Sequence, residues 1–183
     1  MTYIDPLELL GTRALRIAKM LRISRLPFFT GSIHPFTDYF KGFEKVEAVR
    51  RLFGERTEEV LGNLKIELTA IGGYMWVSNV DGHLVVSSRY LGSGDRVDVF
   101  LDVIHELVHV KQFMEGKELF DVHYDYADRP TEIEAYRYAV AEARNIGLSD
   151  ERICEYLKTE WMSYDEFKRL AKILNVECAQ TYL

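Results

Sequence analysis

Apolar residues in the first third of the chain recur at the three- and four-residue steps of amphipathic helices. The pattern predicts one helix over residues 5–23, with Pro6 in its first turn. It predicts a second helix from about residue 37 to 53 and a short helical turn within 55–63. Residues 1–63 are therefore expected to form an N-terminal helical segment.

After residue 64, apolar residues begin to recur at every second position, as in a strand. Residues 65–71 alternate polar and apolar positions, and residues 74–79 and 83–88 are rich in aromatic and β-branched side chains. Asp81-Gly82 joins the last two runs, and Asp-Gly is a strong signal for a hairpin turn. This region is expected to form a small, mostly antiparallel sheet of about three strands.

A strongly periodic helix is predicted directly after the sheet, between Asp95 and Gly116. Asp95 follows a glycine-rich stretch and can cap the helix, and Gly116 stands where a helix is expected to end. Residues 117–129 are too irregular to predict. A further helix begins near Pro130, capped by Asp128 or Thr131, and ends before residue 147.

Two shorter helices are expected at the C-terminal end, over residues 149–159 and from Ser163 onward. Ser163 and Glu166 have the spacing of a capping box. The whole pattern predicts an α+β fold in three parts: an N-terminal helical segment (1–63), a core of sheet and two helices (64–147), and a C-terminal helical segment (148–183). We expect the parts to pack as one compact unit.

Composition narrows the classes of partner and compartment. The 183 residues carry a net charge of −6, which disfavours non-specific binding of nucleic acid. No apolar run approaches the roughly 20 residues of a membrane span, and no signal peptide is evident. The two cysteines, Cys154 and Cys178, suggest neither a metal-binding pair nor a disulfide framework. These features predict a soluble, cytoplasmic protein, and they do not indicate its oligomeric state.

The helix of residues 95–116 contains the sequence His105-Glu106-Leu107-Val108-His109. Residues four apart share one helix face, so the two imidazoles can bind one Zn²⁺ with a carboxylate beside them. Catalytic zinc needs a third protein ligand. Glu132 is favoured because small residues on its side of the next helix permit close packing, whereas Glu134 faces about 200° away. Asp121, His123 and Asp125 remain outside candidates.

In such a site Glu106 would be the general base that activates the attacking water and passes its proton to the leaving amine. A donor to the developing oxyanion is also expected, and the open candidates are Tyr136, His123, Tyr124, Tyr126 and the tyrosines of the C-terminal helices. Asp102 either orients a histidine or supports the helix in another way. The competing interpretation is an ion-paired or buried histidine pair, or a zinc site that only stabilises the fold. A zinc ligand role for Cys178 is a weaker alternative.

The two segments together resemble the gluzincin metallopeptidases. These have a histidine helix of this form and a third ligand opening a segment E-x-x-A-x-x-[FY]-A, which here is Glu132-Ile133-Glu134-Ala135-Tyr136-Arg137-Tyr138-Ala139. Within them the chain is most similar to the minigluzincins, small relatives of the catalytic domains of HtpX-type and CAAX-processing membrane peptidases. The resemblance covers residues 64–145. It departs at Tyr136, where many relatives carry Asp or Asn.

The resemblance implies a zincin-like fold, one zinc ion per chain, and hydrolysis of a peptide or protein substrate. It implies a last strand that lines the cleft, so Val85, Val86, Ser87 and Ser88 would bind substrate as an added strand. It also implies that a terminal segment of the chain covers the cleft in a latent form. A second resemblance, to ImmA/IrrE-type proteins, leaves a non-catalytic, zinc-stabilised regulatory or interaction protein as the alternative.

Overall fold

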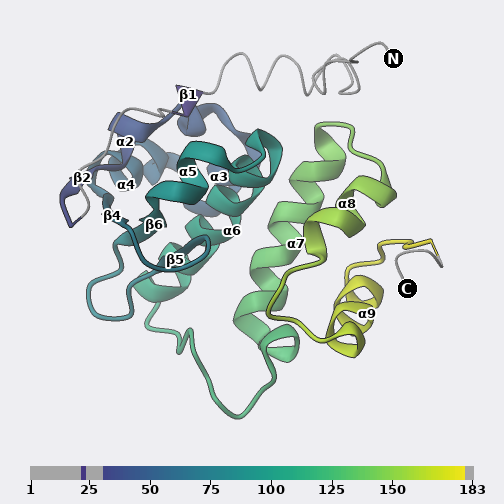
Figure 1. Ribbon diagram of the computed structural model, residues 1–183. Coiled ribbons are helices and arrows are strands. Elements are labelled where there is room, and N and C mark those ends of the chain that lie inside the picture. The colour runs from purple at the N-terminus through teal and green to yellow at the C-terminus, as the bar shows by residue number, and fades with distance from the viewer. Residues whose placement is uncertain (1–21, 24–30, 180–183) are drawn as a thin grey trace.

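The computed structural model describes residues 22–23 and 31–179 of the chain. It is an α+β protein in which a sheet with its helices stands beside three C-terminal helices (Figure 1). The first predicted helix lies outside the described residues as far as residue 21, and Arg22–Ile23 form strand β1 instead. None of the described helices is both long and apolar enough to span a membrane.

The main sheet has four strands rather than the expected three. They are β2 (Ile33–Pro35), β4 (Lys65–Thr69), β5 (Met75–Val77) and β6 (Leu84–Ser87), in the order β2-β4-β6-β5. The hairpin prediction is confirmed, because β5 pairs antiparallel with β6. The sheet is mixed, since β4 pairs parallel with β6 while β2 pairs antiparallel with β4. A second, two-stranded sheet joins β1 to β3 (Phe40–Lys41).

The single helix predicted for residues 37–53 is wrong. The chain instead forms α2 (Phe36–Tyr39), strand β3, the 3₁₀ turn η2 (Phe43–Lys45) and α3 (Glu47–Phe53). Gly42 has a φ of +92°, a left-handed conformation that glycine adopts readily and that cannot continue a helix. The apolar residues still reach the core, and Phe36, Phe40 and Phe43 pack ring against ring. The 3₁₀ turn η3 (Gly54–Arg56) and helix α4 (Thr57–Asn63) follow.

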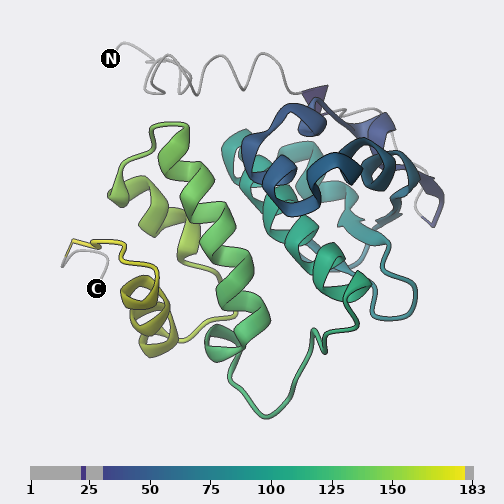
Figure 2. The same cartoon turned by 180° about the vertical axis from the view of Figure 1, so that it is seen from behind.

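Helix α6 (Arg96–Met114) runs through the centre of the molecule and is preceded by α5 (Ser88–Ser93). The predicted cap is present: the Asp95 side chain accepts hydrogen bonds from the backbone N–H groups of Val97 and Asp98. After a long connection and the 3₁₀ turn η4 (Tyr126–Asp128), α7 (Pro130–Asn145) packs along α6 (Figure 2). Ala135 and Ala139 on α7 are fully buried, as close helix packing requires. The cap position of α7 is Arg129 rather than Asp128 or Thr131.

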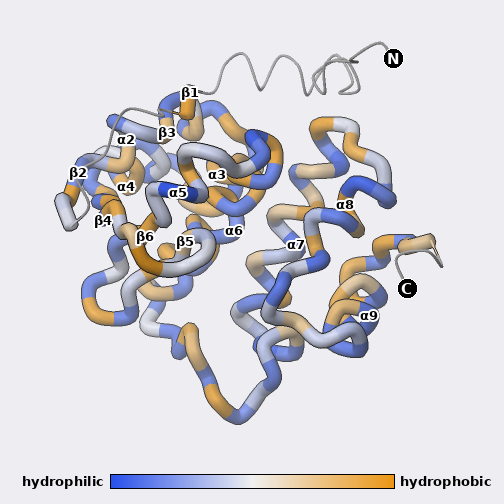
Figure 3. Tube along the Cα trace, viewed as in Figure 1, coloured by the Kyte–Doolittle hydropathy of each residue, from blue (hydrophilic) through white to orange (hydrophobic). Residues whose placement is uncertain are grey.

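The C-terminal segment folds into α8 (Asp150–Leu157) and α9 (Tyr164–Ile173) beside α7. Apolar and polar positions mix along each of these helices (Figure 3), and Ile153, Leu157 and Leu170 are fully buried. The capping box of Ser163 and Glu166 is present as predicted.

Cys154 and Cys178 form a disulfide across this segment, contrary to the expectation that they stay unpaired. The pairing depends on α9 folding back along α8, which no local pattern reveals. Disulfides are rare in reducing cytosol, so the cysteines give no support to a cytoplasmic location. The Cys178 sulfur is bonded in this disulfide, so Cys178 has no thiolate with which to bind zinc.

Candidate metal centre

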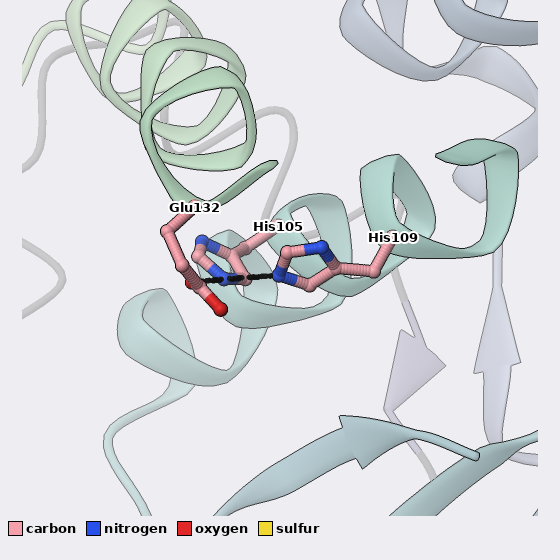
Figure 4. Close-up of side chains that lie close together, drawn as sticks. All are labelled: His105, His109 and Glu132. Carbon is pink, nitrogen blue, oxygen red and sulfur yellow. Dashed lines mark hydrogen bonds and ion pairs between the residues drawn. The ribbon is translucent and has the colours of Figure 1, made fainter. Parts of the chain in front are cut away.

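Three buried side chains from α6 and α7 point toward one another. His105 and His109 lie one turn apart on α6, and Glu132 lies in the first turn of α7 (Figure 4). All three side chains are at least nine-tenths buried. The structure thus brings together the two histidines of the motif and the glutamate favoured as third ligand.

The spacing of their donor atoms fits a metal ion. The two Nε2 atoms are 3.0 Å apart, and Oε2 of Glu132 lies 3.2 Å from Nε2 of His105 and 3.5 Å from Nε2 of His109. Tetrahedral zinc with nitrogen and oxygen ligands at about 2.0–2.1 Å separates those ligands by about 3.3 Å. Oε2 of Glu132 is buried without a hydrogen bond partner, which is the expected state of an atom reserved for a metal.

Gln112, which the sequence did not single out, orients His109. Its Oε1 lies 2.7 Å from Nδ1 of His109, and its amide donates to the backbone oxygen of Thr131 and to Glu134, at 3.0 and 2.9 Å. Because the amide N–H groups are used, Oε1 must accept, so Nδ1 of His109 carries the proton and Nε2 is free to bind a cation. Only the spacing of three residues from His109 could have suggested this role.

His105 is held by packing instead. The ring of Tyr136 lies edge-on to the His105 ring, with centroids 4.4 Å apart, and the Tyr136 hydroxyl is 3.1 Å from that of Tyr126. Nδ1 of His105 is buried and has no hydrogen bond partner. Tyr136 therefore fixes the ring of His105 by an aromatic contact.

The two carboxylates of the centre have pKa values shifted in opposite directions. Burial raises the pKa of Glu106 to about 8, which is suited to a group that takes up and releases a proton. Burial acts on Glu132 in the same sense, but the adjacent His105 and His109 side chains outweigh it and hold the pKa of Glu132 well below its usual range. Glu132 is therefore held as an anion, whereas the equilibrium of Glu106 is shifted toward its protonated form.

Two cavities meet at the centre, and both are lined by Glu106, His105, Met75, Tyr126 and Trp161. The first, of about 160 Å³, lies toward the N-terminal half of α6 and is lined also by Asp98, Asp102 and Glu155; we call it the acidic cavity. The second, of about 150 Å³, is lined also by Trp76, Val77, Leu119 and Phe120; we call it the apolar cavity. One oxygen of Glu106, Oε2, is buried there without a hydrogen bond partner.

The structure separates the remaining candidates. His123 is exposed and, among the described residues, bonds only to Asp121; Tyr124 is half-exposed, and neither residue lines either cavity. Asp102 accepts a hydrogen bond from the Tyr90 hydroxyl and makes none to a histidine, so the predicted role of orienting a ligand is not seen. Of the tyrosines considered, Tyr126 and Tyr136 remain at the centre.

Residues 85–88, which we expected to bind substrate as an added strand, have no free strand edge in this structure. Strand β6 has β4 on one side and β5 on the other, so Val85 and Val86 have no free edge to offer. Ser87 caps helix α5 and Ser88 is its first residue. Among the described strands, β5 is the one whose outer edge is open beside the centre, and Met75 to Val77 line the apolar cavity.

No protein-family model, curated protein or solved structure matches this chain. A buried His-His-Glu group can hold a metal ion, with a neighbouring carboxylate whose pKa is raised and a cavity on either side.

Proposed function

We propose that the chain is a zinc-dependent metallopeptidase. His105, His109 and Glu132 would bind the zinc ion, and Glu106 would be the general base in the hydrolysis of peptide bonds. The observation that supports it best is a donor set spaced for tetrahedral zinc, directly beside a buried glutamate with an unpartnered oxygen facing two cavities. Zinc bound there would lower the pKa of a water toward about 7 and polarise a substrate carbonyl.

The chain's own residues supply the remaining steps. Glu106 takes a proton from the attacking water and delivers it to the nitrogen of the leaving amine. Tyr126 borders both cavities, and burial raises its pKa well above the usual range, so its hydroxyl stays protonated and can donate to the developing oxyanion. The Tyr136 hydroxyl, 3.1 Å away, would donate to the Tyr126 oxygen and so leave the Tyr126 proton for the oxyanion.

The substrate backbone would align along β5. An extended peptide can pair with the open edge of this strand, and its side chains can then enter the cavities on either side of Glu106. The exposed Trp76 and Phe120 at the apolar cavity favour an apolar substrate residue on that side.

The C-terminal segment would restrict access to this cleft. Trp161, in the loop between α8 and α9, lines both cavities and contacts the ring of Tyr74 at 4.9 Å and that of Tyr126 at 6.0 Å. It therefore bridges the two walls above Glu106. Removal of the whole segment is a poor test of latency, because α8 contributes the buried residues Ile153 and Leu157. Trp161→Gly should increase cleavage of long peptides while Tyr164→Gly, an exposed change in the next helix, should not.

Glu106→Gln tests the proposal as a whole. Zinc content should stay at one per chain in this variant and fall in His105→Ala, while cleavage of a broad peptide library should drop by about 10²- to 10⁴-fold. If zinc-loaded wild type and Glu106→Gln are equally inert on the library, even with Trp161→Gly added, the chain is a zinc-stabilised regulatory or interaction protein instead.

A further inference from the structure

The acidic cavity contains a carboxylate that no positive side chain of the described residues neutralises. Asp102, on α6 one turn before His105, accepts a hydrogen bond from the Tyr90 hydroxyl. No lysine, arginine or histidine in the described part of the chain forms an ion pair with it. Its neighbour Asp98 differs, because Arg152 of α8 binds both Asp98 and the capping Asp95. Asp102 is partly buried, and a partly buried negative charge without a cationic partner is costly unless a ligand supplies one.

Two buried hydroxyl groups also line the same cavity. Tyr156 is only 8% exposed, and its hydroxyl lies near Asp102 without forming a hydrogen bond of normal geometry, so its oxygen is open to a donor. The Thr159 hydroxyl is buried and unpartnered as well. Both residues line the acidic cavity together with Asp102. Buried hydroxyls are normally satisfied, so these are acceptors available to an incoming donor.

The cavity walls suit the stem of such a donor. The rings of Tyr74, Tyr90 and Trp161 line it, and aromatic faces attract both methylene groups and cations. Its volume of about 160 Å³ would hold on the order of ten water molecules, which is space for one long side chain. Lys158 and Glu155 lie at its exposed rim, so the rim carries one charge of each sign.

From these features we infer that the acidic cavity is a specificity pocket for a lysine-like side chain of the substrate, with Asp102 as its anionic end. An ammonium group donates three hydrogen bonds, and the cavity provides three acceptors in Asp102, Tyr156 and Thr159. The pocket would select a basic residue on one side of the cleaved bond, opposite the apolar cavity. This inference rests on the proposed peptidase function and names the substrate class of the same centre.

The C-terminal segment then has a second role. Tyr156 and Thr159 belong to α8 and the loop after it, which the Arg152 ion pairs attach to the N-terminal turn of α6. The segment would thus build one wall of the substrate pocket, and it would not act only as a cover.

Binding of a matched ligand pair tests the pocket without depending on turnover. N-acetyl-lysine amide and its norleucine counterpart differ in the terminal ammonium, and calorimetry would compare them on the zinc-loaded full chain carrying Glu106→Gln. We expect the lysine ligand to bind roughly 10- to 100-fold more tightly, the usual effect of a charge-assisted hydrogen bond. Adding Asp102→Asn should abolish the preference, whereas Asp165→Asn, the same change on the exposed face of α9, should leave it intact.

Equal binding of the two ligands would overturn the inference, and this comparison needs no Asp102 variant to fold. A preference that survives Asp102→Asn would overturn it as well. Failure of the peptidase proposal looks different: the lysine preference would persist and depend on Asp102 while wild type cleaves nothing. Cleavage by wild type with no preference for lysine would leave the peptidase standing and remove the pocket.

Discussion

Asp102 makes a quantitative prediction about stability. Burial raises its pKa from 3.8 to about 6, against the opposing effect of the nearby hydroxyls of Tyr90 and Tyr156. The folded chain therefore holds this proton to higher pH than the unfolded chain does. The resulting stability is fully present below about pH 4 and is lost as the pH rises through about 6. Asp102→Asn keeps the shape of the side chain and removes this dependence.

The pKa difference corresponds to at most about 3 kcal/mol of unfolding free energy, at about 1.4 kcal/mol per pH unit. The wild type should lose about 2 kcal/mol of this unfolding free energy between pH 4.5 and 7.5. Over that range the stability of Asp102→Asn, measured relative to wild type, should rise by this amount. Urea unfolding followed by tryptophan fluorescence, with a chelator present throughout, would measure it. Other titrating groups cancel in the difference between the two proteins.

Asp165→Asn provides the matched control. Its carboxylate is fully exposed, and the hydrogen bond from Lys168 lowers the pKa of Asp165, so any change should be small and of opposite sign. A difference in stability between wild type and Asp102→Asn that stays constant from about pH 4.5 to 7.5 would refute the reasoning, because it would mean that the cavity solvates Asp102 as well as water does.

Three further predictions concern the metal and the cross-link. Removal of zinc by a chelator should lower the free energy of unfolding by about 4 kcal/mol relative to protein with free zinc at about 1,000 times its Kd, which lowers the Tm by roughly 8–16 °C. Added zinc should restore the Tm, and an unchanged Tm would contradict the zinc site. Gln112→Leu should weaken zinc binding by about 10- to 100-fold in competition with a chromophoric chelator, because His109 loses the group that orients it, and an unaltered affinity would refute that role. Reduction of the Cys154–Cys178 disulfide, whose cysteines are 24 positions apart, should lower the free energy of unfolding measured in urea by about 3 to 4 kcal/mol. If reduction leaves this free energy unchanged, packing alone holds the C-terminal segment.

The parts of the fold that were predictable from the sequence are those with local causes. Helix α6 has a capping side chain at Asp95, a stop at Gly116 and a continuous apolar period, so its bounds were predicted closely. Glu132 followed from the helix-face argument, because side-chain direction on a helix depends only on residue number. The hairpin of β5 and β6 followed from its Asp-Gly turn.

The parts that were not predictable depend on contacts between distant segments. The parallel pairing of β4 with β6 leaves β5 as the open edge, and no alternation of residues specifies which strand lies outside. Gln112 acts through Thr131 and Glu134, which only the packing of α7 brings within reach. The break at Gly42 did have a local signal, but the apolar spacing of the neighbouring phenylalanines fits a helix equally well.

The long connection between the two ligand-bearing helices has a further consequence. It extends away from the body of the molecule in Figure 1, and Val122 within it is 85% exposed. A nick at Val122 would leave α6 in one fragment and α7 in the other, each holding an incomplete ligand set. Exposed tips of this kind tolerate cleavage or new chain ends. On the proposed function, one zinc ion would join the two fragments, and this connection is the point at which to divide the chain into a zinc-dependent split pair.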